Sequence, residues 1–416
     1  MTRRGHRVTR GARLASTAVV VAAFAAAALG GAAASAPAQP QQVVTLTVNT
    51  LPIANGFPLD LGIRRGFFRA QRIEINKRTL QSGNDIVLAL GNRNGEIGYV
   101  GWVPAMIART QGIPLTAVAA SDVEGTSNND NWQNILVKGD SSIRRPADLS
   151  GRSIAVNALK GVGEVMIKAA LRKRGVNPNS IRLVAMPFPT MPAALRNGQV
   201  DAIWTPEPFM SQALRDGARV VMAPGPVLGR FWPIGTYVAH DEWVRRNPAV
   251  ARRFRIAMAR SLAYAQSHPA EIRELLPAAS RDVRLPIWSP LIDRAKLRQL
   301  ARFSRDFGVI ASLPNLSALV PRNVTGGKTL QGTVRNASIT LLVDGRTVRT
   351  LPEGEYTFVV ADRSRTQSFR LVGPGVRRST TARFVGRATW TLSLRPGRYT
   401  YGSTGSRSLT RTFRVR

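Results

Sequence analysis

The sequence predicts an α/β protein followed by a small all-β sandwich, and three observations lead to this prediction. The chain has 416 residues, which is too long for one compact core and indicates two or three folding units. From Val43 onward, short apolar runs alternate with amphipathic segments, as in parallel α/β layers. Near Gly326-Gly327 this alternation stops, and the remaining residues show period-two runs and turn signals.

Residues 1–38 are predicted to serve export. Five arginines precede an apolar run from Leu14 to Leu29, and small residues follow it up to Ala36-Pro37-Ala38. That order is typical of a secretory signal peptide, with cleavage after Ala38. Arg3-Arg4 could direct the twin-arginine route, and an uncleaved membrane anchor is the alternative. We therefore expect an exported protein that is periplasmic, extracellular or at the cell surface.

The first α/β series is expected between Val43 and about Asn131. Ser82, Asn84 and Asp85 are suited to cap a helix that begins at Gly83, because their side chains can accept hydrogen bonds from the first helical amides. The predicted strands are Val44–Val48, Ile73–Lys77, Ile97–Val100 and Leu115–Ala119, and the predicted helices are Leu59–Phe68, Gly83–Leu90 and Pro104–Arg109.

A second α/β series follows Asn131, and the chain beyond Tyr237 is expected to be largely helical. Helices are also expected around Ala193 and Phe209. The predicted strands are Ile135–Val137, Ser153–Val156, Arg182–Ala185, Ala202–Trp204 and Arg219–Met222, and the predicted helices are Val162–Arg172, Pro248–Ser267, Ala270–Leu276 and Ile292–Phe307.

The β-rich segment follows a predicted linker at Thr325–Lys328. Asp344-Gly345 separates two apolar runs, Ile339–Val343 and Thr347–Leu351, which is typical of a β-hairpin. The other predicted strands are Tyr356–Val360, Phe369–Val372, Ala388–Leu394 and Thr410–Val415.

Composition excludes several classes of function. The chain has no cysteine and only three scattered histidines, so a disulfide scaffold, a thiolate site and a multi-histidine metal site are all excluded. The formal charge of +35 suggests nucleic acid, but the arginines are spread along the chain and no basic run is interleaved with aromatics. We predict no nucleic-acid binding, while contact with anionic cell-envelope polymers is compatible with this charge. Recognisable catalytic motifs are missing, which disfavours an enzyme.

Candidate binding residues lie where strands lead into helices. The first amides of a helix attract anions and polar groups. Gln81–Asp85 and Asn157–Glu164 could present such helix starts, and glycines in the second segment would let a ligand approach the backbone. Two prolines flank Glu207, which fits either ligand contact or a helix start. Trp102, Trp132 and Trp232 lie near strand ends, where each could grip a ligand or pack in the core.

Taken together, these segments resemble substrate-binding proteins of ABC transporters for aliphatic sulfonates, nitrate, taurine and thiamine precursors. The similarity covers about Val43 to Val320. Arg72-Ile73 departs from the usual Gly-Leu of the family. The matching segments are Leu51-Pro52-Ile53-Ala54-Asn55, Leu61–Phe68, Gln81–Asp85, Glu96–Gly101, Asp148–Val156 and Val200–Pro208.

The resemblance implies a two-lobed type II periplasmic-binding-protein fold, with lobe one at 43–131 and 236–325 and lobe two at 134–233. It implies a monomer that binds a small solute between the lobes and delivers it to an ABC permease, without a cofactor or metal. Sulfonate and nitrate binders usually carry hydroxyls where this chain has Gly161-Val162-Gly163, so the solute stays open. The implied ligand-binding residues are Pro52, Asn55, Ser82, Gly83, Asn84, Gly101, Trp102, Leu159, Lys160, Gly161, Val162 and Glu207.

Residues 328–416 resemble a plastocyanin-type cupredoxin domain in Gly354–Val360, Phe369–Val376 and Arg395–Tyr401. Blue copper needs two His and one Cys, and the matching positions hold Gln367, Ser403, Ser406 and Leu409. A copper-free β-sandwich is therefore expected. Two alternatives stay open for the whole chain. One is a pyrimidine-synthase-like enzyme, whose reactive histidine and Cys-rich motif are not visible in the sequence, and the other is a cell-envelope adhesion protein.

Overall fold

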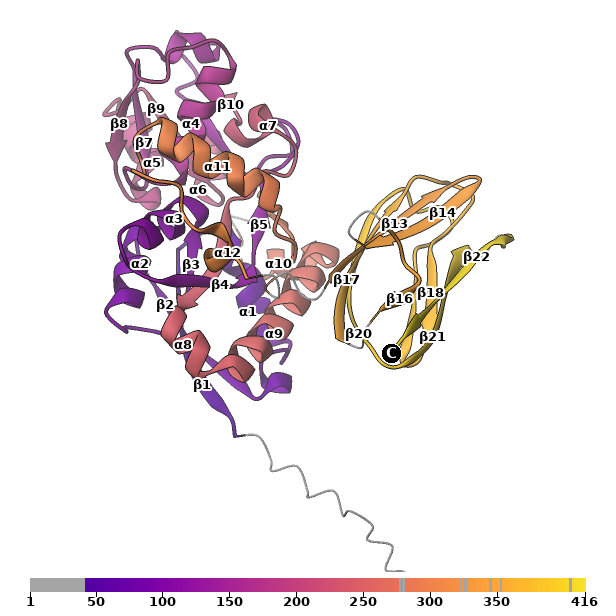
Figure 1. The fold of residues 1–416 in the computed structure, drawn as a ribbon. Helices are drawn as coiled ribbons and strands as arrows, with labels where there is room; N and C mark the ends of the chain where they lie inside the picture. The colour runs from indigo at the N-terminus through magenta and orange to yellow at the C-terminus, as the bar shows by residue number, and fades with distance from the viewer. Residues whose placement is uncertain are drawn as a thin grey trace, which may run out of the picture. The chain divides into compact units, whose positions relative to one another are not determined.

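The computed structural model describes residues 42–276, 278, 281–321, 324, 328–343, 346–351, 354–403 and 406–416. Two α/β sheets and two further β-sheets account for most of this chain (Figure 1). The α/β fold with an all-β C-terminal segment is thus confirmed. The predicted signal peptide, the glycines of the predicted linker and the Asp344-Gly345 turn lie outside the described residues. Within the described residues, no helix combines the length and apolarity needed to cross a membrane.

The first sheet has the order β2-β1-β3-β11-β4. Strand β1 pairs in parallel with β2 and β3, whereas β11 is antiparallel to both of its neighbours. The chain beyond Tyr237 is largely helical, as predicted, but its first three residues belong to strand β11, which was not predicted. The strands are β1 Val44–Thr50, β2 Ile73–Thr79, β3 Ile97–Gly101, β4 Leu115–Ala120 and β11 Gly235–His240.

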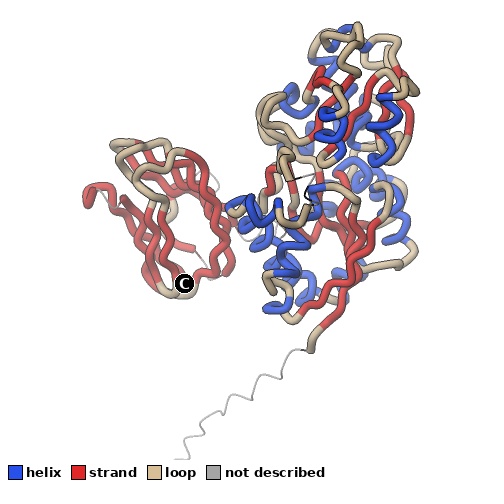
Figure 2. The backbone as a smooth tube through the Cα atoms, turned by 180° about the vertical axis from the view of Figure 1, so that it is seen from behind, coloured by secondary structure: helices blue, strands red, loops and turns tan. Residues whose placement is uncertain are grey.

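Helices cover both faces of this sheet (Figures 1 and 2). A Cβ at Gly98 would contact Ile86 and Leu90 of α2, whereas Tyr237, on the neighbouring strand β11, contacts Phe254 of α9. Helix α1 ends at Arg64, short of the predicted end, and Gly66 then turns the chain with a φ of 70°. The helices are α1 Phe57–Arg64, α2 Gly83–Gly91, α3 Trp102–Thr110, α8 Asp241–Arg246 and α9 Pro248–Ser267.

The second sheet has the order β10-β6-β9-β7-β8. Here β7 pairs in parallel with β8 and β9, and β6 is antiparallel to β9 and β10. Each α/β sheet therefore contains one reversed strand, which the prediction of purely parallel layers missed. The elements are β6 Gln133–Val137, β7 Ser153–Val156, α4 Val162–Lys173, β8 Arg182–Ala185, α5 Met191–Arg196, β9 Ala202–Pro206, α6 Phe209–Arg215, β10 Arg219–Met222 and α7 Pro224–Leu228.

Two crossovers join the sheets, and they pair with each other. Glu124 N donates to Trp232 O at 2.8 Å, and Ile234 N donates to Asp122 O at 3.2 Å. Strand β12 (Ile287–Trp288) adds to the other side of β5 (Asp122–Val123). We call residues 122–125 and 231–234 the crossover ribbon. The reversed strands β6 and β11 are the ones that the chain enters after each crossover, so the ribbon sets their direction.

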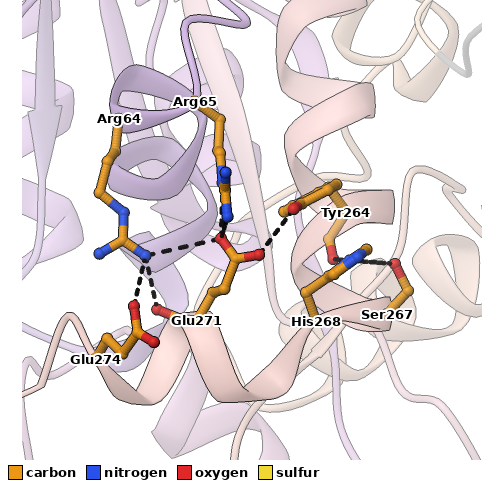
Figure 3. A network of polar contacts seen from close by, with 7 residues as sticks. All are labelled: Arg64, Arg65, Tyr264, Ser267, His268, Glu271 and Glu274. Carbon is orange, nitrogen blue, oxygen red and sulfur yellow. Dashed lines mark hydrogen bonds and ion pairs between the residues drawn. The ribbon is translucent and has the colours of Figure 1, made fainter.

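Three further helices follow β11 and α9: α10 Pro269–Arg273, α11 Arg294–Asp306 and α12 Leu316–Leu319. A polar network ties the end of α1 to α9 and α10 (Figure 3). Glu271 accepts hydrogen bonds from Arg65 Nε and Tyr264 Oη, each at 2.7 Å, and these bonds lower the pKa of Glu271. The His268 ring stacks on Tyr264 with a centroid distance of 3.8 Å. Because α1 follows the first loop of the candidate site, this network helps to fix that loop.

Residues 328–416 form two five-stranded sheets, β15-β14-β13-β17-β20 and β16-β22-β21-β18-β19, with their own core. The predicted strand Thr347–Leu351 is split, because β15 pairs with β14 while β16 pairs with β22 in the other sheet. The strands are β13 Lys328–Arg335, β14 Ser338–Val343, β15 Arg346–Thr347, β16 Thr350–Leu351, β17 Gly354–Asp362, β18 Arg370–Gly373, β19 Val376–Ser379, β20 Gly386–Leu394, β21 Gly397–Ser403 and β22 Ser406–Val415.

Candidate functional site

Several predicted site residues meet at the boundary between the two α/β sheets. We call the first sheet with its helices the first lobe, and the second sheet with its helices the second lobe. Asn84 Nδ2 donates to Leu159 O at 3.5 Å, and Ala54 N donates to Glu207 O at 3.0 Å. A Cβ added to Gly101 would lie 2.8 Å from Val162 Cγ2. We call these three contacts the interlobe seam, and each joins a residue of one lobe to a residue of the other.

The first-lobe side of the seam begins at the carboxyl end of β1. Pro52 is half-buried in the loop that follows, and Asn55 is fully buried in a short 3₁₀ turn. Asn55 Nδ2 donates to Asp122 Oδ2 at 2.7 Å, which links this loop to the crossover ribbon. Asn55 Oδ1 is buried and has no hydrogen-bond partner among the described residues, so this loop retains one unused acceptor.

The start of α2 forms the next part of the seam. Ser82 Oγ accepts a hydrogen bond from Asp85 N at 3.2 Å and donates one to Asp85 Oδ2 at 2.8 Å, which confirms the predicted cap. A Cβ at Gly83 would lie 3.3 Å from Pro104 of α3, so this glycine permits close packing of the two helices. Asn84, half-buried, is the residue of this turn that reaches the second lobe.

The three candidate tryptophans pack in the core of the α/β lobes. Trp102, Trp132 and Trp232 are each at most 1% exposed. Trp102 N donates to Ile234 O at 2.9 Å, and Trp132 Nε1 donates to Val123 O at 2.9 Å. The structure thus shows the rings of these three tryptophans packed in the core.

At the start of α4, Glu164 of the first turn forms a hydrogen bond with the segment that precedes the helix. Lys160 has a φ of 54°, and its N–H donates to Glu164 Oε2 at 2.8 Å, while Lys168 Nζ donates to Glu164 Oε1 at 2.7 Å. Leu159 and Lys160 are exposed, and Gly161 is the N-cap residue. An acidic residue in the first turn of a helix often accepts a hydrogen bond from the backbone at the helix start, but the sequence analysis did not predict this contact for Glu164.

Gly163 is needed for packing, because a Cβ there would lie 2.6 Å from Trp204 Cε3. The structure thus gives a packing reason for this glycine, and ligand access to its backbone stays a prediction. Its close neighbour is an aromatic ring of the second lobe, which fills the space that a side chain would need.

Glu207 is fully buried, and protein donors surround its carboxylate. Oε1 accepts from Ser211 Oγ at 2.8 Å and from Arg284 N at 3.1 Å, and Oε2 accepts from Ser211 N at 3.0 Å. Burial raises the pKa of this carboxyl, and the hydrogen bonds from Ser211 oppose the rise. The carboxylate thus joins the start of α6 to the segment before β12, and the backbone carbonyl of Glu207 lies at the seam.

Two buried carboxylates in the crossover ribbon were missed by the sequence reasoning. Asp122 accepts hydrogen bonds from Asn55 Nδ2 and, at 2.9 Å, from Tyr99 Oη, both in the first lobe. Glu124 accepts from Gln133 Nε2 at the start of the second lobe and from Asn131 Nδ2. Each carboxylate of the ribbon therefore receives donors from a different lobe.

Burial raises the pKa of Asp122 to about 6 and that of Glu124 to about 8. Within the described part of the chain, neither carboxylate forms an ion pair with a lysine or arginine within 4.0 Å. Gly225 approaches Glu124 so closely that a Cβ there would lie 1.8 Å from Oε2. The connection between β4 and β6 is rich in Ser, Asn and Asp, so its sequence did not distinguish these two carboxylates from solvated ones.

The described residues hold no group of three or more His, Asp or Glu side chains placed to bind a metal ion. The lobes, their paired crossovers and the seam form an arrangement in which bending at the ribbon would open and close the boundary between them.

Residues 55–272 match the model of the protein family described as NMT1/THI5 like, which is more than half of the chain. The chain belongs to this family. The NMT1/THI5-like region contains the second sheet, every strand of the first sheet except β1, and the crossover ribbon.

Relatives of this NMT1/THI5-like chain include the taurine-binding periplasmic protein of Escherichia coli (strain K12), which is 25% identical over 190 residues, covering 45% of this chain and 56% of the relative. The bicarbonate-binding protein CmpA of Synechococcus sp. is 24% identical over 237 residues, covering 51% and 52%. The chain thus spans about half the length of these curated relatives.

Solved structures show the same fold. The alkanesulfonate-binding protein SsuA from Xanthomonas axonopodis pv. citri, bound to MOPS, has a TM-score of 0.58 at 20% identity, with 68% of this chain and 99% of that chain covered. The periplasmic aliphatic sulphonate binding protein SsuA from Escherichia coli has a TM-score of 0.55 at 21% identity, covering 68% and 98%. At this level of identity the likeness establishes the fold of the two lobes, and function is a separate question.

Proposed function

We propose that this chain is the extracytoplasmic solute-binding component of an ABC importer. The observation that carries the proposal is the seam, where loops and helix starts of two lobes meet while a paired ribbon joins the lobes. Such an arrangement can trap a small molecule by bending at the ribbon, and the closed form can then dock on a membrane permease. The names of the relatives, which bind taurine, bicarbonate and alkanesulfonate, support a transport role.

The solute that we propose is a small organic or anionic molecule of the sulfonate, nitrate, taurine or thiamine-precursor type. We place it at the seam, against the loop of Pro52 and Asn55, the start of α2 and the start of α4. The start of α4 differs from a simple copy of the sulfonate site, because the Glu164 carboxylate already accepts the hydrogen bond from Lys160 N and pairs with Lys168. An oxyanion would therefore rely on the first-lobe side.

The proposal includes export by the predicted signal peptide, a monomeric and non-catalytic protein, and no nucleic-acid partner. The proposed copper-free sandwich at 328–416 is suited to contact anionic envelope polymers, because its exposed strands carry several arginines, such as Arg377 and Arg378.

The test combines native mass spectrometry of freshly purified full-length protein with thermal unfolding. We expect a co-purified small molecule, or a rise in melting temperature with one of taurine, an alkanesulfonate, nitrate, bicarbonate or an aminopyrimidine, because a ligand that binds only the folded state stabilises it. The variant Gly101→Leu, which places a side chain in the seam, should lose this rise. If no solute is found by either method, or if the protein retains pyridoxal phosphate and converts it, the transport role is wrong.

A further inference from the structure

A pocket of about 290 Å³ lies between α11 and the segment that contains α12, away from the residues of the seam. Arg294, Arg298 and Arg302 follow one another at intervals of four residues, so they lie on one face of α11. The remaining lining is mostly apolar and consists of Leu297, Ala301, Leu313, Pro314, Leu316, Ser317 and Val320. The pocket therefore has a basic wall and an apolar floor.

Among the described residues that line this pocket, none is acidic. The two aspartates that flank α11 are engaged elsewhere: Asp293 caps the helix and pairs with Lys296 at 3.4 Å, and Asp306 pairs with Arg172 at 3.5 Å. Arg298 is exposed, like Arg302, and the described residues offer neither of them an ion pair within 4.0 Å. The part of the chain that the structure describes thus places no carboxylate within ion-pair distance of Arg298 or Arg302.

The position of α11 gives the pocket contact with both lobes. The helix packs on α3 of the first lobe and α4 of the second. Lys296 Nζ donates to Arg230 O at 2.7 Å, beside the crossover ribbon, and Phe303 stacks on Trp232 of the ribbon with a centroid distance of 6.3 Å. The Arg172 guanidinium of α4 lies over Phe307, 4.7 Å from the ring centroid. A ligand against α11 would therefore rest on the element that touches both lobes.

We propose that this pocket binds a small amphiphilic anion, with a carboxylate or sulfonate head group on a short aliphatic body. The planar guanidinium groups of Arg298 and Arg302 can each donate two hydrogen bonds to such a head group. The aliphatic body would lie on Leu297, Leu316 and their apolar neighbours, which removes its surface from water. The volume suits a molecule of this size and is too small for a helix of a partner protein.

The test is isothermal titration of the full-length protein with hexanoate, with hexan-1-ol as the uncharged control. We expect hexanoate to bind and hexan-1-ol to bind far more weakly. The double variant Arg298→Ala/Arg302→Ala should weaken hexanoate binding at least about tenfold, because it removes the charge-assisted hydrogen bonds to the carboxylate. Arg252→Ala, which removes an exposed arginine from α9, is the matched control and should leave binding unchanged.

A second variant tests the pocket by shape instead of charge. Ser317 is exposed and lines the pocket, so Ser317→Trp should fill it and abolish hexanoate binding without loss of the folded core. In Gly101→Leu, which obstructs the seam, hexanoate binding should persist even if solute binding is lost. Unchanged binding in the double variant and in Ser317→Trp, or equal binding of hexan-1-ol, would overturn the proposal. Loss of hexanoate binding in Gly101→Leu would place the anion at the seam and overturn it as well.

Discussion

Glu124 and Asp122 lie in the backbone connection between the lobes, and both side chains are buried. Among the described residues, neutral donors such as Asn55, Tyr99, Gln133 and Asn131 form hydrogen bonds to these carboxylates. Removing an isolated carboxylate from water disfavours its charged form, which is the cause of the raised pKa of each group. The two residues therefore make the stability of the connection depend on pH.

The direction of this dependence follows from the pKa of Glu124, which is about 8 in the folded protein against an ordinary value of 4.5. Between these values the folded state holds the proton more tightly than the unfolded state. The stabilisation is therefore fully present below about pH 4.5 and is lost as the pH rises through 8. We predict that Glu124→Gln reduces the fall in melting temperature between pH 5 and pH 8.

Thermal unfolding at several pH values measures this effect. Glu74→Gln, which changes an exposed glutamate on β2, is the control and should keep the pH dependence of the original protein. A loss of 1 kcal/mol shifts the melting temperature by roughly 2–4 °C in a domain of about 200 residues, so the difference is measurable. An identical pH profile for Glu124→Gln and the original protein would contradict the prediction.

At the residue scale, the sequence predicted local contacts, whereas the packing of individual side chains was outside its reach. The cap at Ser82 follows from local chemistry and is confirmed. The roles of Gly163 and the three tryptophans depend on what packs against them, and local sequence does not contain that information. Asp122 and Glu124 were missed for the same reason, because a pair of acidic residues in a connection reads as a solvated turn unless the burial is known.

Helix α11 shows how one element can bind two lobes together. Arg172 of α4 lies over Phe303 at 5.2 Å and over Phe307 at 4.7 Å, and it also pairs with Asp306 at 3.5 Å. Stacking of a guanidinium on an aromatic ring contributes about 0.5–1 kcal/mol at an exposed site. These contacts attach the end of α11 to the second lobe.

We predict that Arg172→Ala loosens α11 locally. Hydrogen–deuterium exchange of the amides in α11 should become faster, while the melting temperature falls by only a few degrees, because each lost contact contributes about 1 kcal/mol. Arg174→Ala, two residues further along in an exposed position, should leave the exchange of α11 unchanged. Equal exchange of α11 in both variants would show that Arg172 does not attach it.

Most elements were predictable, since the apolar periodicity of long helices and central strands is strong. Helix α9 was predicted with the bounds that the structure shows, and α11 within two residues at its start. The sequence did not predict strand β11 or the division of Thr347–Leu351 between two sheets, because both depend on pairing with strands that are distant in the sequence. Local patterns also cannot give strand direction, so the reversed β6 and β11 were missed.

On the scale of the whole molecule, the described chain contains two hydrophobic cores that share no residue. One includes the sheets of both α/β lobes and extends to Val324, and the other begins at Leu330 and includes Phe358, Phe369 and Tyr399. A region with its own core can unfold separately from the rest.

We predict that residues 328–416, expressed alone, fold into a β-rich monomer with a cooperative thermal transition. Circular dichroism should show strand content, and calorimetry of the full chain should show a matching transition beside that of the α/β lobes. A disordered fragment, together with a single transition for the full chain, would contradict this prediction and the proposed domain boundary.

A second prediction for the whole molecule concerns the distance between the two lobes. Gly101→Leu places a side chain against Val162 and should hold the lobes apart, which small-angle X-ray scattering would detect as a larger radius of gyration. Adding Val162→Ala removes the opposing methyl groups and should restore part of the original radius. If the single and double variants scatter alike, Gly101 and Val162 do not control the approach of the lobes.

The pairing of the two crossovers also limits how the lobes can move. Hydrogen bonds between Glu124 and Trp232 and between Ile234 and Asp122 prevent the two connections from sliding past each other, and β12 reinforces one edge. Shear and twist are therefore resisted, and flexing perpendicular to the paired strands is the softest deformation. Because the two crossovers are held in one register, any movement of one lobe against the other has to bend both connections together.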